Sequence, residues 1–208
     1  MNLVKVYKKL YLSFGPQYWW PAESPFEVMV GAILTQNTSW LNVRKAINNL
    51  KQHKLLTARK LYKIPEKKLA LLIKPAGYYN IKAKRLKAFL DFLFKHYRGE
   101  IQHMLHANIP TLRRQLLSVK GIGPETADSI LLYALEKPIF VVDAYTKRML
   151  ARHNLIKEDA PYEKIQKLFM RNLKKGVKLF NEYHALLVKL GKDFCHKSKP
   201  KCDICPLK

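Results

Sequence analysis

A turn built on two glycines is the segment of this sequence best suited to bind a phosphate. Residues 119 to 127 read VKGIGPETA, with Gly121 and Gly123 two positions apart and Pro124 directly after them. Glycine reaches positive φ at little cost and proline fits the first turn of a helix, so we expect a tight turn that leads into a helix. The unpaired amides at such a helix start bind anions such as phosphate.

A single acid follows this turn within an apolar run. Asp143 is the only carboxylate in residues 139 to 144, which read IFVVDA. It can cap a helix that starts at Ala144, because its side chain accepts a hydrogen bond from a free amide of the first turn. An acid on an apolar segment that follows a phosphate-binding turn is also the strongest candidate for chemistry in the chain.

The chain is strongly basic. Lys and Arg total 39 against 15 Asp and Glu, which gives a formal net charge of +24. Such an excess indicates a polyanionic partner, with nucleic acid ahead of a membrane surface; the alternative is a lysine-rich surface that binds nothing. The basic residues are spread over the whole chain, which favours a folded body with a basic face over a basic tail.

The rest of the composition predicts a globular protein of the cytoplasm. Apolar residues make up 48% of the 208, enough for a buried core. No apolar stretch approaches the roughly 20 residues that cross a bilayer, and the start, MNLVKVYKKLYLSF, lacks a secretory signal, so we expect no membrane partner. All three cysteines fall in the last fourteen residues, a placement that does not suggest a disulfide framework.

The spacing of apolar residues predicts an all-α fold of about ten helices with short connections. No segment alternates as a half-buried strand does. A nearly all-apolar helix over 26–36, after Ser24-Pro25, should be central and buried. The other expected helices include 2–14, two short helices and one long helix within 57–98, then 110–117, 143–155, 161–173 and 177–190.

Two adjacent tryptophans, Trp19 and Trp20, stand in a stretch bracketed by prolines. Packing usually buries only one of two neighbours, so we expect one ring to face a cleft, where stacking on a nucleobase is worth roughly 1–3 kcal/mol per base. The alternative is a loop anchor packed on the core. Trp40, at the start of a helix, is open to the same two interpretations.

Five motifs in this order resemble the helix-hairpin-helix (HhH-GPD) DNA glycosylase superfamily, and within it the endonuclease III branch. They cover nearly the whole chain: GAILTQNT at 31–38, GYYNIKA at 77–83, the Gly-Ile-Gly turn, Val142-Asp143 and the terminal cysteines. The resemblance implies two helical lobes with a DNA-binding groove between them. Residues 22–137 would form the lobe with the helix-hairpin-helix, and residues 1–21 with 138–208 the second lobe, which carries the cysteine loop.

The resemblance also implies base excision repair, in which a damaged nucleotide is flipped out of double-stranded DNA and its N-glycosidic bond is cut. Asp143 falls on the catalytic aspartate of the family, where a carboxylate stabilises the oxocarbenium-like sugar and orients or deprotonates water. Endonuclease III proper has a lysine where this chain has Glu125. Without that amine no Schiff base forms there, and Lys120 is a doubtful substitute, so we expect a monofunctional glycosylase without efficient AP lyase activity.

Within the branch, the tryptophan stretch resembles the 3-methyladenine DNA glycosylases. There the aromatics form a stacking pocket for alkylated purines, whose positive charge an electron-rich ring attracts by roughly 0.5–2 kcal/mol. Gln36 aligns with the side chain that fills the gap left by the flipped base. The residues assigned to the base pocket and intercalation are Trp19, Trp20, Pro21, Gln36, Trp40 and Glu125. Those assigned to DNA phosphate are Lys120, Gly121, Ile122, Gly123, Thr126 and Lys82.

Cys195, Cys202 and Cys205 resemble the [4Fe–4S] loop of the family. The family has a fourth cysteine a few residues further on, and the sequence given ends at Lys208, before that position. Either the sequence is incomplete, or the cluster is lost or ligated differently. We expect the cluster; with His196 or His184 the three thiolates could instead bind zinc, and no metal is the third possibility.

Two other functions stay open at this stage. The same scaffold serves glycosylases for oxidised pyrimidines or mispaired bases, and a helix-hairpin-helix module can bind DNA without any chemistry. In each case we expect a monomer that is cytoplasmic and associated with the nucleoid.

Overall fold

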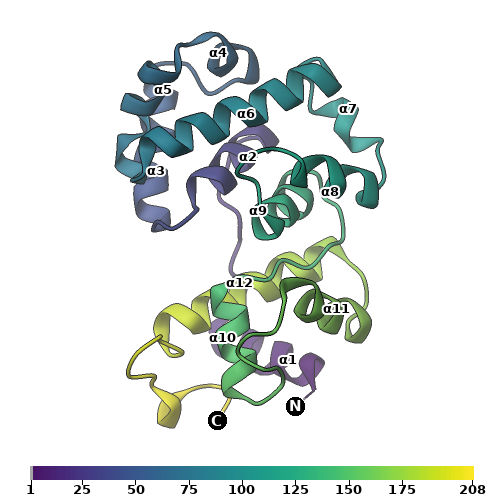
Figure 1. Ribbon diagram of the computed structural model, residues 1–208. Coiled ribbons are helices and arrows are strands. Elements are labelled where there is room, and N and C mark those ends of the chain that lie inside the picture. Colours follow the sequence, from purple (N-terminus) through teal and green to yellow (C-terminus); the bar gives the residue numbers. More distant parts are fainter. Residues whose placement is uncertain (1) are drawn as a thin grey trace. The chain divides into compact units, whose positions relative to one another are not determined.

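The structure, a computed structural model, describes residues 2 to 208 as helices joined by loops (Figure 1). No β-strand occurs in this range, so the prediction of an all-α fold is confirmed. Within the same range, no helix is both long enough and apolar enough to pass through a membrane. The chain divides into two compact units: a central unit, Ala22–Leu135, and a terminal unit, formed by the residues up to Pro21 together with Glu136–Lys208.

The central unit is organised around α2 (Pro25–Leu34), which is buried from Phe26 to its end. Ser24 caps the helix, because its hydroxyl accepts the N–H of Glu27 at 3.2 Å. A helix that is apolar on all sides has to lie in a core, and α2 contacts α3, α6 and α9. The further elements are α3 (Trp40–Gln52), α4 (Ala58–Lys63), α5 (Glu66–Leu72), η1 (Lys74–Ala76), α6 (Tyr79–Tyr97), α7 (Gln102–Leu105), α8 (Ile109–Leu117), α9 (Pro124–Ser129) and the π-helical η2 (Ile130–Ala134).

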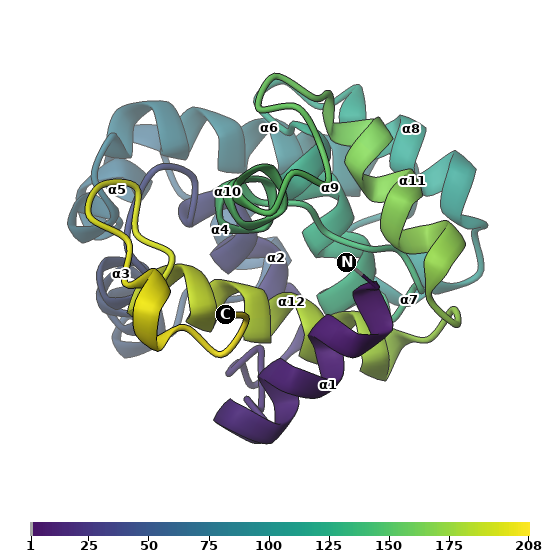
Figure 2. The ribbon, with the colours of Figure 1, turned by 90° about the horizontal axis from the view of Figure 1, so that it is seen from below.

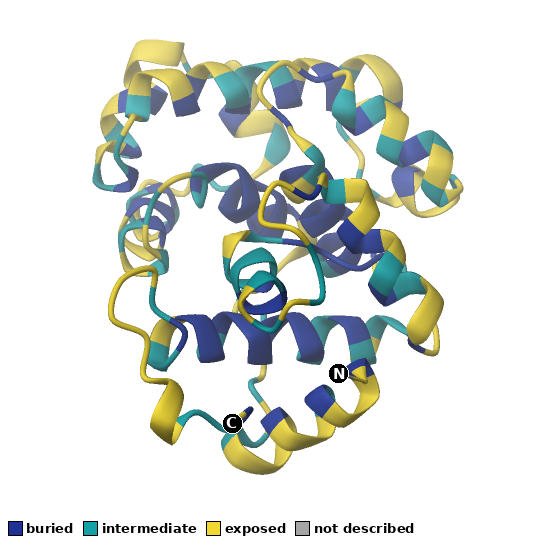
Figure 3. Cartoon of the chain, turned by 60° about the horizontal axis from the view of Figure 1, so that its bottom comes forward, coloured by how far each residue is buried: buried dark blue, intermediate teal, exposed yellow. Residues whose placement is uncertain are grey.

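The terminal unit brings the first helix of the chain against the last long one. It contains α1 (Leu3–Phe14), α10 (Ala144–Arg152), α11 (Tyr162–Asn172), α12 (Val177–Asp193) and η3 (Cys202–Ile204). Figure 2 shows α1 beside α12, and Figure 3 shows that the buried positions of α1 lie on one side of the helix. The core is aromatic: Phe140 stacks on Phe169 at 3.9 Å between ring centroids, and Tyr183 lies edge-on to both.

The close approach of α10 and α12 depends on a glycine. A Cβ added at Gly191 would lie 2.2 Å from Cδ1 and 2.7 Å from Cβ of Tyr145. These atoms belong to the base of the tyrosine side chain, which cannot swing aside as a flexible side-chain end would. Gly191 therefore sets the distance between the two helices.

We predict that Gly191→Ser lowers the free energy of unfolding by roughly 1–3 kcal/mol, because overpacking forces the two helices apart. Urea unfolding followed by far-UV circular dichroism measures this. The matched control is Gly176→Ser: no atom lies within 4 Å of an added Cβ there, and the residue caps α12, a place that serine fills well. Equal stability of the two variants would contradict the packing argument.

Candidate functional site

Asp143 is the N-cap of α10. Its backbone is extended, and one carboxylate oxygen, Oδ1, accepts the N–H of Thr146 at 2.7 Å. The capping geometry expected from the sequence is therefore present. Because the cap uses a single oxygen, the other remains available for a second interaction.

The second oxygen of Asp143 faces a histidine of α12. His184 Nε2 lies 3.6 Å from Asp143 Oδ2, and the two side chains are only 7% and 10% exposed. Burial alone would raise the pKa of Asp143, but His184, followed by the amide and hydroxyl of Thr146, holds that pKa below its ordinary value. The carboxylate is therefore an anion at neutral pH, in surroundings with little water.

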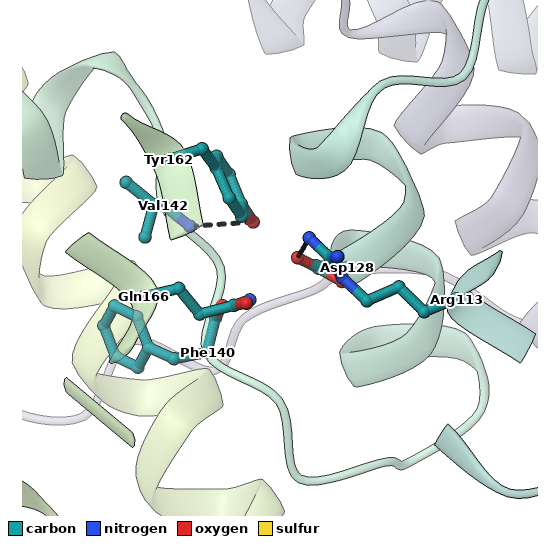
Figure 4. A network of polar contacts seen from close by, with 6 residues as sticks. All are labelled: Arg113, Asp128, Phe140, Val142, Tyr162 and Gln166. Atoms are coloured by element: carbon teal, nitrogen blue, oxygen red, sulfur yellow. Dashed lines mark hydrogen bonds and ion pairs between the residues drawn. The ribbon is translucent and has the colours of Figure 1, made fainter. Parts of the chain in front are cut away.

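Two contacts from α11 fix the extended segment that precedes Asp143. Gln166 Nε2 donates to the carbonyl of Phe140 at 2.7 Å, and the N–H of Val142 donates to the hydroxyl of Tyr162 at 3.3 Å (Figure 4). These backbone groups belong to no helix, so side chains have to satisfy them. Sequence analysis did not single out Gln166 or Tyr162, because nothing local connects them with residues 140 to 142.

The predicted turn forms a hairpin, residues 118–123, between α8 and α9. Gly121 has a φ of +90°, a value that requires glycine, and the N–H of Ile122 donates to the carbonyl of Val119 at 3.0 Å. Gly121, Gly123 and Lys120 are exposed, whereas the side chain of Ile122 is buried. The amides available for an anion are thus those of the two glycines.

An ion pair ties the two helices of the hairpin together. Arg113 of α8 makes two contacts with Asp128 of α9, from Nε to Oδ1 at 2.8 Å and from Nη2 to Oδ2 at 3.1 Å (Figure 4). Asp128 is fully buried, and such a two-point contact restricts the orientation of both side chains. This pair was also missed in the sequence, where the two residues are ordinary charges on separate helices.

Lys82, which was assigned to DNA phosphate, has other partners in the structure. Lys82 is 1% exposed, and its Nζ donates to the carbonyls of Leu34 at 2.8 Å and Ala76 at 2.7 Å. Burial, with a further contribution from Arg85, lowers the pKa of Lys82 to about 8. The prediction that Lys82 contacts phosphate is wrong, because its ammonium group is buried beneath two helix ends.

Gln36, assigned to intercalation, is half-buried and contacts the hairpin in this structure, and its place in a duplex stays a prediction. Its Nε2 donates to the carbonyl of Gly121 and to the hydroxyl of Thr126, both at 3.0 Å, and its Oε1 accepts from Arg85. Thr126 itself is 7% exposed, so its hydroxyl serves this contact. Arg85, which sequence analysis did not single out, packs against Gly121 of the hairpin.

The tryptophan stretch is attached to α12. Trp19 and Trp20 are half-buried and lie edge to face, with ring centroids 5.5 Å apart, and Pro21 is exposed. Lys192 Nζ lies 5.8 Å from the centroid of Trp19. The neighbouring Tyr18 is 85% exposed, an aromatic face that sequence analysis passed over.

Two further residues assigned to the base pocket belong to the central unit. Trp40 is half-buried at the first position of α3, and Glu125 is exposed in the first turn of α9. Their place beside the tryptophans of the terminal unit stays a prediction.

The cysteine loop is held by two arginines of α10. Arg148 Nε donates to the carbonyl of Cys195 at 2.6 Å, and Arg152 Nη1 contacts Cys195 Sγ at 3.2 Å. Across residues 2 to 208, no group of three or more Cys, His, Asp or Glu side chains is arranged to hold a metal. His184 faces Asp143, which removes it from the zinc alternative, and the loop offers three thiols where a [4Fe–4S] cluster uses four.

Comparison with known proteins identifies the family. The HhH-GPD superfamily model of base excision DNA repair proteins matches residues 30–175. A protein of Methanocaldococcus jannaschii named "Putative DNA repair glycosylase MJ1434" is 53% identical over 208 residues, covering 99% of this chain and 94% of that protein. Endonuclease III of Rickettsia conorii is 28% identical over 186 residues, 89% of this chain and 83% of the relative.

Solved structures agree with this assignment. The H. pylori 3-methyladenine DNA glycosylase MagIII, bound to 1,N6-ethenoadenine, has a TM-score of 0.80 at 30% identity, over 92% of this chain and 98% of that one. A non-covalent endonuclease III–DNA complex has a TM-score of 0.83 at 22% identity, over 99% and 91%, a likeness of fold. The chain belongs to the HhH-GPD superfamily of base excision DNA repair proteins.

Proposed function

We propose that the protein is a monofunctional DNA glycosylase that excises an alkylated purine of the 3-methyladenine type from double-stranded DNA. The observation that carries the proposal is the carboxylate of Asp143, which is fixed by two partners and kept anionic in a nearly dry environment. Loss of a base leaves positive charge on the sugar, and a fixed anion with a low effective dielectric around it stabilises that charge. The same carboxylate can orient the attacking water.

The hairpin is the proposed anchor for the DNA backbone. Its two glycines are exposed, and Lys120 beside them is exposed as well, so amides and one cation are available for a phosphate. The net charge of +24 supports binding to a polyanion, and such binding weakens as salt rises, because phosphate neutralisation releases counterions.

Alkylated purines are the favoured substrates for two reasons. The tryptophan stretch offers aromatic rings, and an electron-rich ring attracts the positive charge of an alkylated purine, as the ring of Trp19 attracts Lys192. The likeness to MagIII, a 3-methyladenine glycosylase bound to an adenine derivative, supports the same class. The second candidate, a glycosylase for oxidised pyrimidines or mispaired bases, is supported by the endonuclease III relatives.

Asp143→Asn should lower the single-turnover rate of base excision by at least about a hundredfold, with duplex binding retained. Asparagine keeps the helix cap but loses the charge that faces His184, so urea unfolding of the variant shows how much protein is folded in the assay, and the remaining loss of rate reports the missing charge. The control is Asp159→Asn, which removes an exposed carboxylate from the same unit. A variant at position 143 that excises as fast as wild type would refute the catalytic role of Asp143. A wild-type protein that binds the duplex and releases no base would be a DNA-binding module without chemistry.

On a panel of duplexes that each contain one damaged base, we expect release of 3-methyladenine and 1,N6-ethenoadenine, and an intact abasic site as the product. Because Glu125 supplies no amine, sodium borohydride should trap no covalent protein–DNA complex. Endonuclease III on a thymine glycol duplex serves as the positive control for trapping.

Two results on this panel would contradict the proposal in separate ways. Release of thymine glycol in place of methylated purines would move the substrate to the second candidate. A trapped complex would overturn the monofunctional assignment, and Lys120→Ala would then show whether the exposed lysine of the hairpin is the nucleophile.

The [4Fe–4S] cluster remains a proposal for Cys195, Cys202 and Cys205. The residues described here supply three of the four thiolates that such clusters use, so the fit is incomplete and no step of the reaction depends on the cluster. We expect iron and acid-labile sulfide in the purified protein. Purified protein that contains zinc, or that contains neither iron nor zinc, would refute this.

A further inference from the structure

Gln36 joins two parts of the central unit that are distant in sequence. Its side-chain amide donates to the carbonyl of Gly121 and to the hydroxyl of Thr126, one on each side of Gly123. Its carbonyl accepts from the guanidinium of Arg85 on α6. Both ends of this amide are therefore occupied, and all three partners lie within the same unit.

Arg85 contacts the hairpin as well as Gln36. A Cβ added at Gly121 would lie 2.4 Å from Cγ and 2.9 Å from Nε of Arg85, so the arginine side chain runs directly against the glycine. Two features therefore require glycine at position 121: the φ of +90° and the arginine side chain that packs against it. Gly121 is held from one side by Arg85 and at its carbonyl by Gln36.

The start of the Gln36 segment is fixed from the same helix. Lys82, one turn before Arg85 on α6, donates to the carbonyl of Leu34, the last residue of α2. A cation at a helix C-terminus satisfies carbonyls that have no partner inside the helix. Two cationic side chains of α6 therefore contact this segment: Lys82 at Leu34 and Arg85 at Gln36. These contacts orient Gln36 toward the hairpin.

We propose that Gln36 and Arg85 are positioning residues that keep the hairpin in its DNA-binding conformation. Three hydrogen bonds, one of them to a charged group, hold the side chain of Gln36 against the hairpin and α6. Each peptide unit is planar, so a fixed carbonyl at Gly121 also fixes the N–H of Ile122, which closes the turn on Val119 and lies between the two exposed glycines. The inference rests on the proposed role of the hairpin in binding the DNA backbone.

Gln36→Met separates the two roles. Methionine is an apolar side chain of similar length, and such wedges enter base steps in other proteins, so gap filling would survive the change. The hydrogen bonds to Gly121, Thr126 and Arg85 would not. We expect the dissociation constant for an undamaged duplex to rise roughly tenfold, the size that losing a hydrogen bond to a charged group produces, while the single-turnover excision rate at saturating enzyme stays within about twofold of wild type.

Arg85→Met should give the same loss of duplex affinity, and the double variant should be no weaker than either single variant, because the two residues act as one unit. Lys84→Met is the matched control: it removes one charge from the same turn of α6 at an exposed position and should weaken binding by about threefold or less. If circular dichroism shows that Gln36→Met has lost helical content, Thr126→Val replaces it in the comparison. This variant removes one acceptor of Gln36 and should lose less duplex affinity, in the same direction.

The inference is overturned if Gln36→Met binds undamaged duplex as wild type does but excises more slowly at saturation, which is the signature of gap filling. Additive losses in the double variant would also overturn it. A wild-type protein that released no base from any duplex would refute the proposed function alone, because the affinity measurements on undamaged DNA would still decide the role of Gln36.

Discussion

The double attachment of one carboxylate is the interaction on which the candidate chemistry depends. Oδ1 of Asp143 caps α10 and Oδ2 faces His184 of α12, so the group is fixed in direction and charged although almost buried. A buried carboxylate without such partners would take up a proton, because burial disfavours the charged form. The cap and the histidine thus let the group stay anionic, which the proposed stabilisation of a cationic sugar requires.

α12 connects the parts of the terminal unit that bear on this chemistry. Its His184 faces Asp143, its Gly191 admits the ring of Tyr145 from α10, and its Lys192 lies against Trp19. Gln17, two residues before the tryptophan pair, also donates to Glu182 of the same helix. A shift of α12 would move the carboxylate and the aromatic stretch together, so their geometry depends on the packing of one helix.

The features that the sequence predicted correctly are those set by neighbouring residues. Glycine and proline favour the turn at 121–124 through their own backbone preferences. An aspartate before Ala144 favours the cap of α10 through a hydrogen bond to an amide three residues away. The features that it missed depend on pairs far apart in sequence. Lys82 was assigned to DNA phosphate under the family resemblance, and its carbonyl partner at Leu34 is 48 residues away. His184 was considered only as a zinc ligand, since nothing local connects it with Asp143, and Arg85 carried no local signal.

Charge and geometry contribute differently to DNA binding in this chain. An excess of 24 positive charges attracts a duplex in any register, since the attraction to phosphates carries no sequence information and declines with salt. Chemistry on one nucleotide requires in addition that a particular phosphate be held at a fixed place. The hairpin can supply this only if its glycines, which are intrinsically the most flexible residues, are prevented from moving. Contacts from Gln36 and Arg85 restrict that freedom at Gly121, whereas no atom lies within 4 Å of an added Cβ at Gly123, so the restriction acts on the first glycine of the turn.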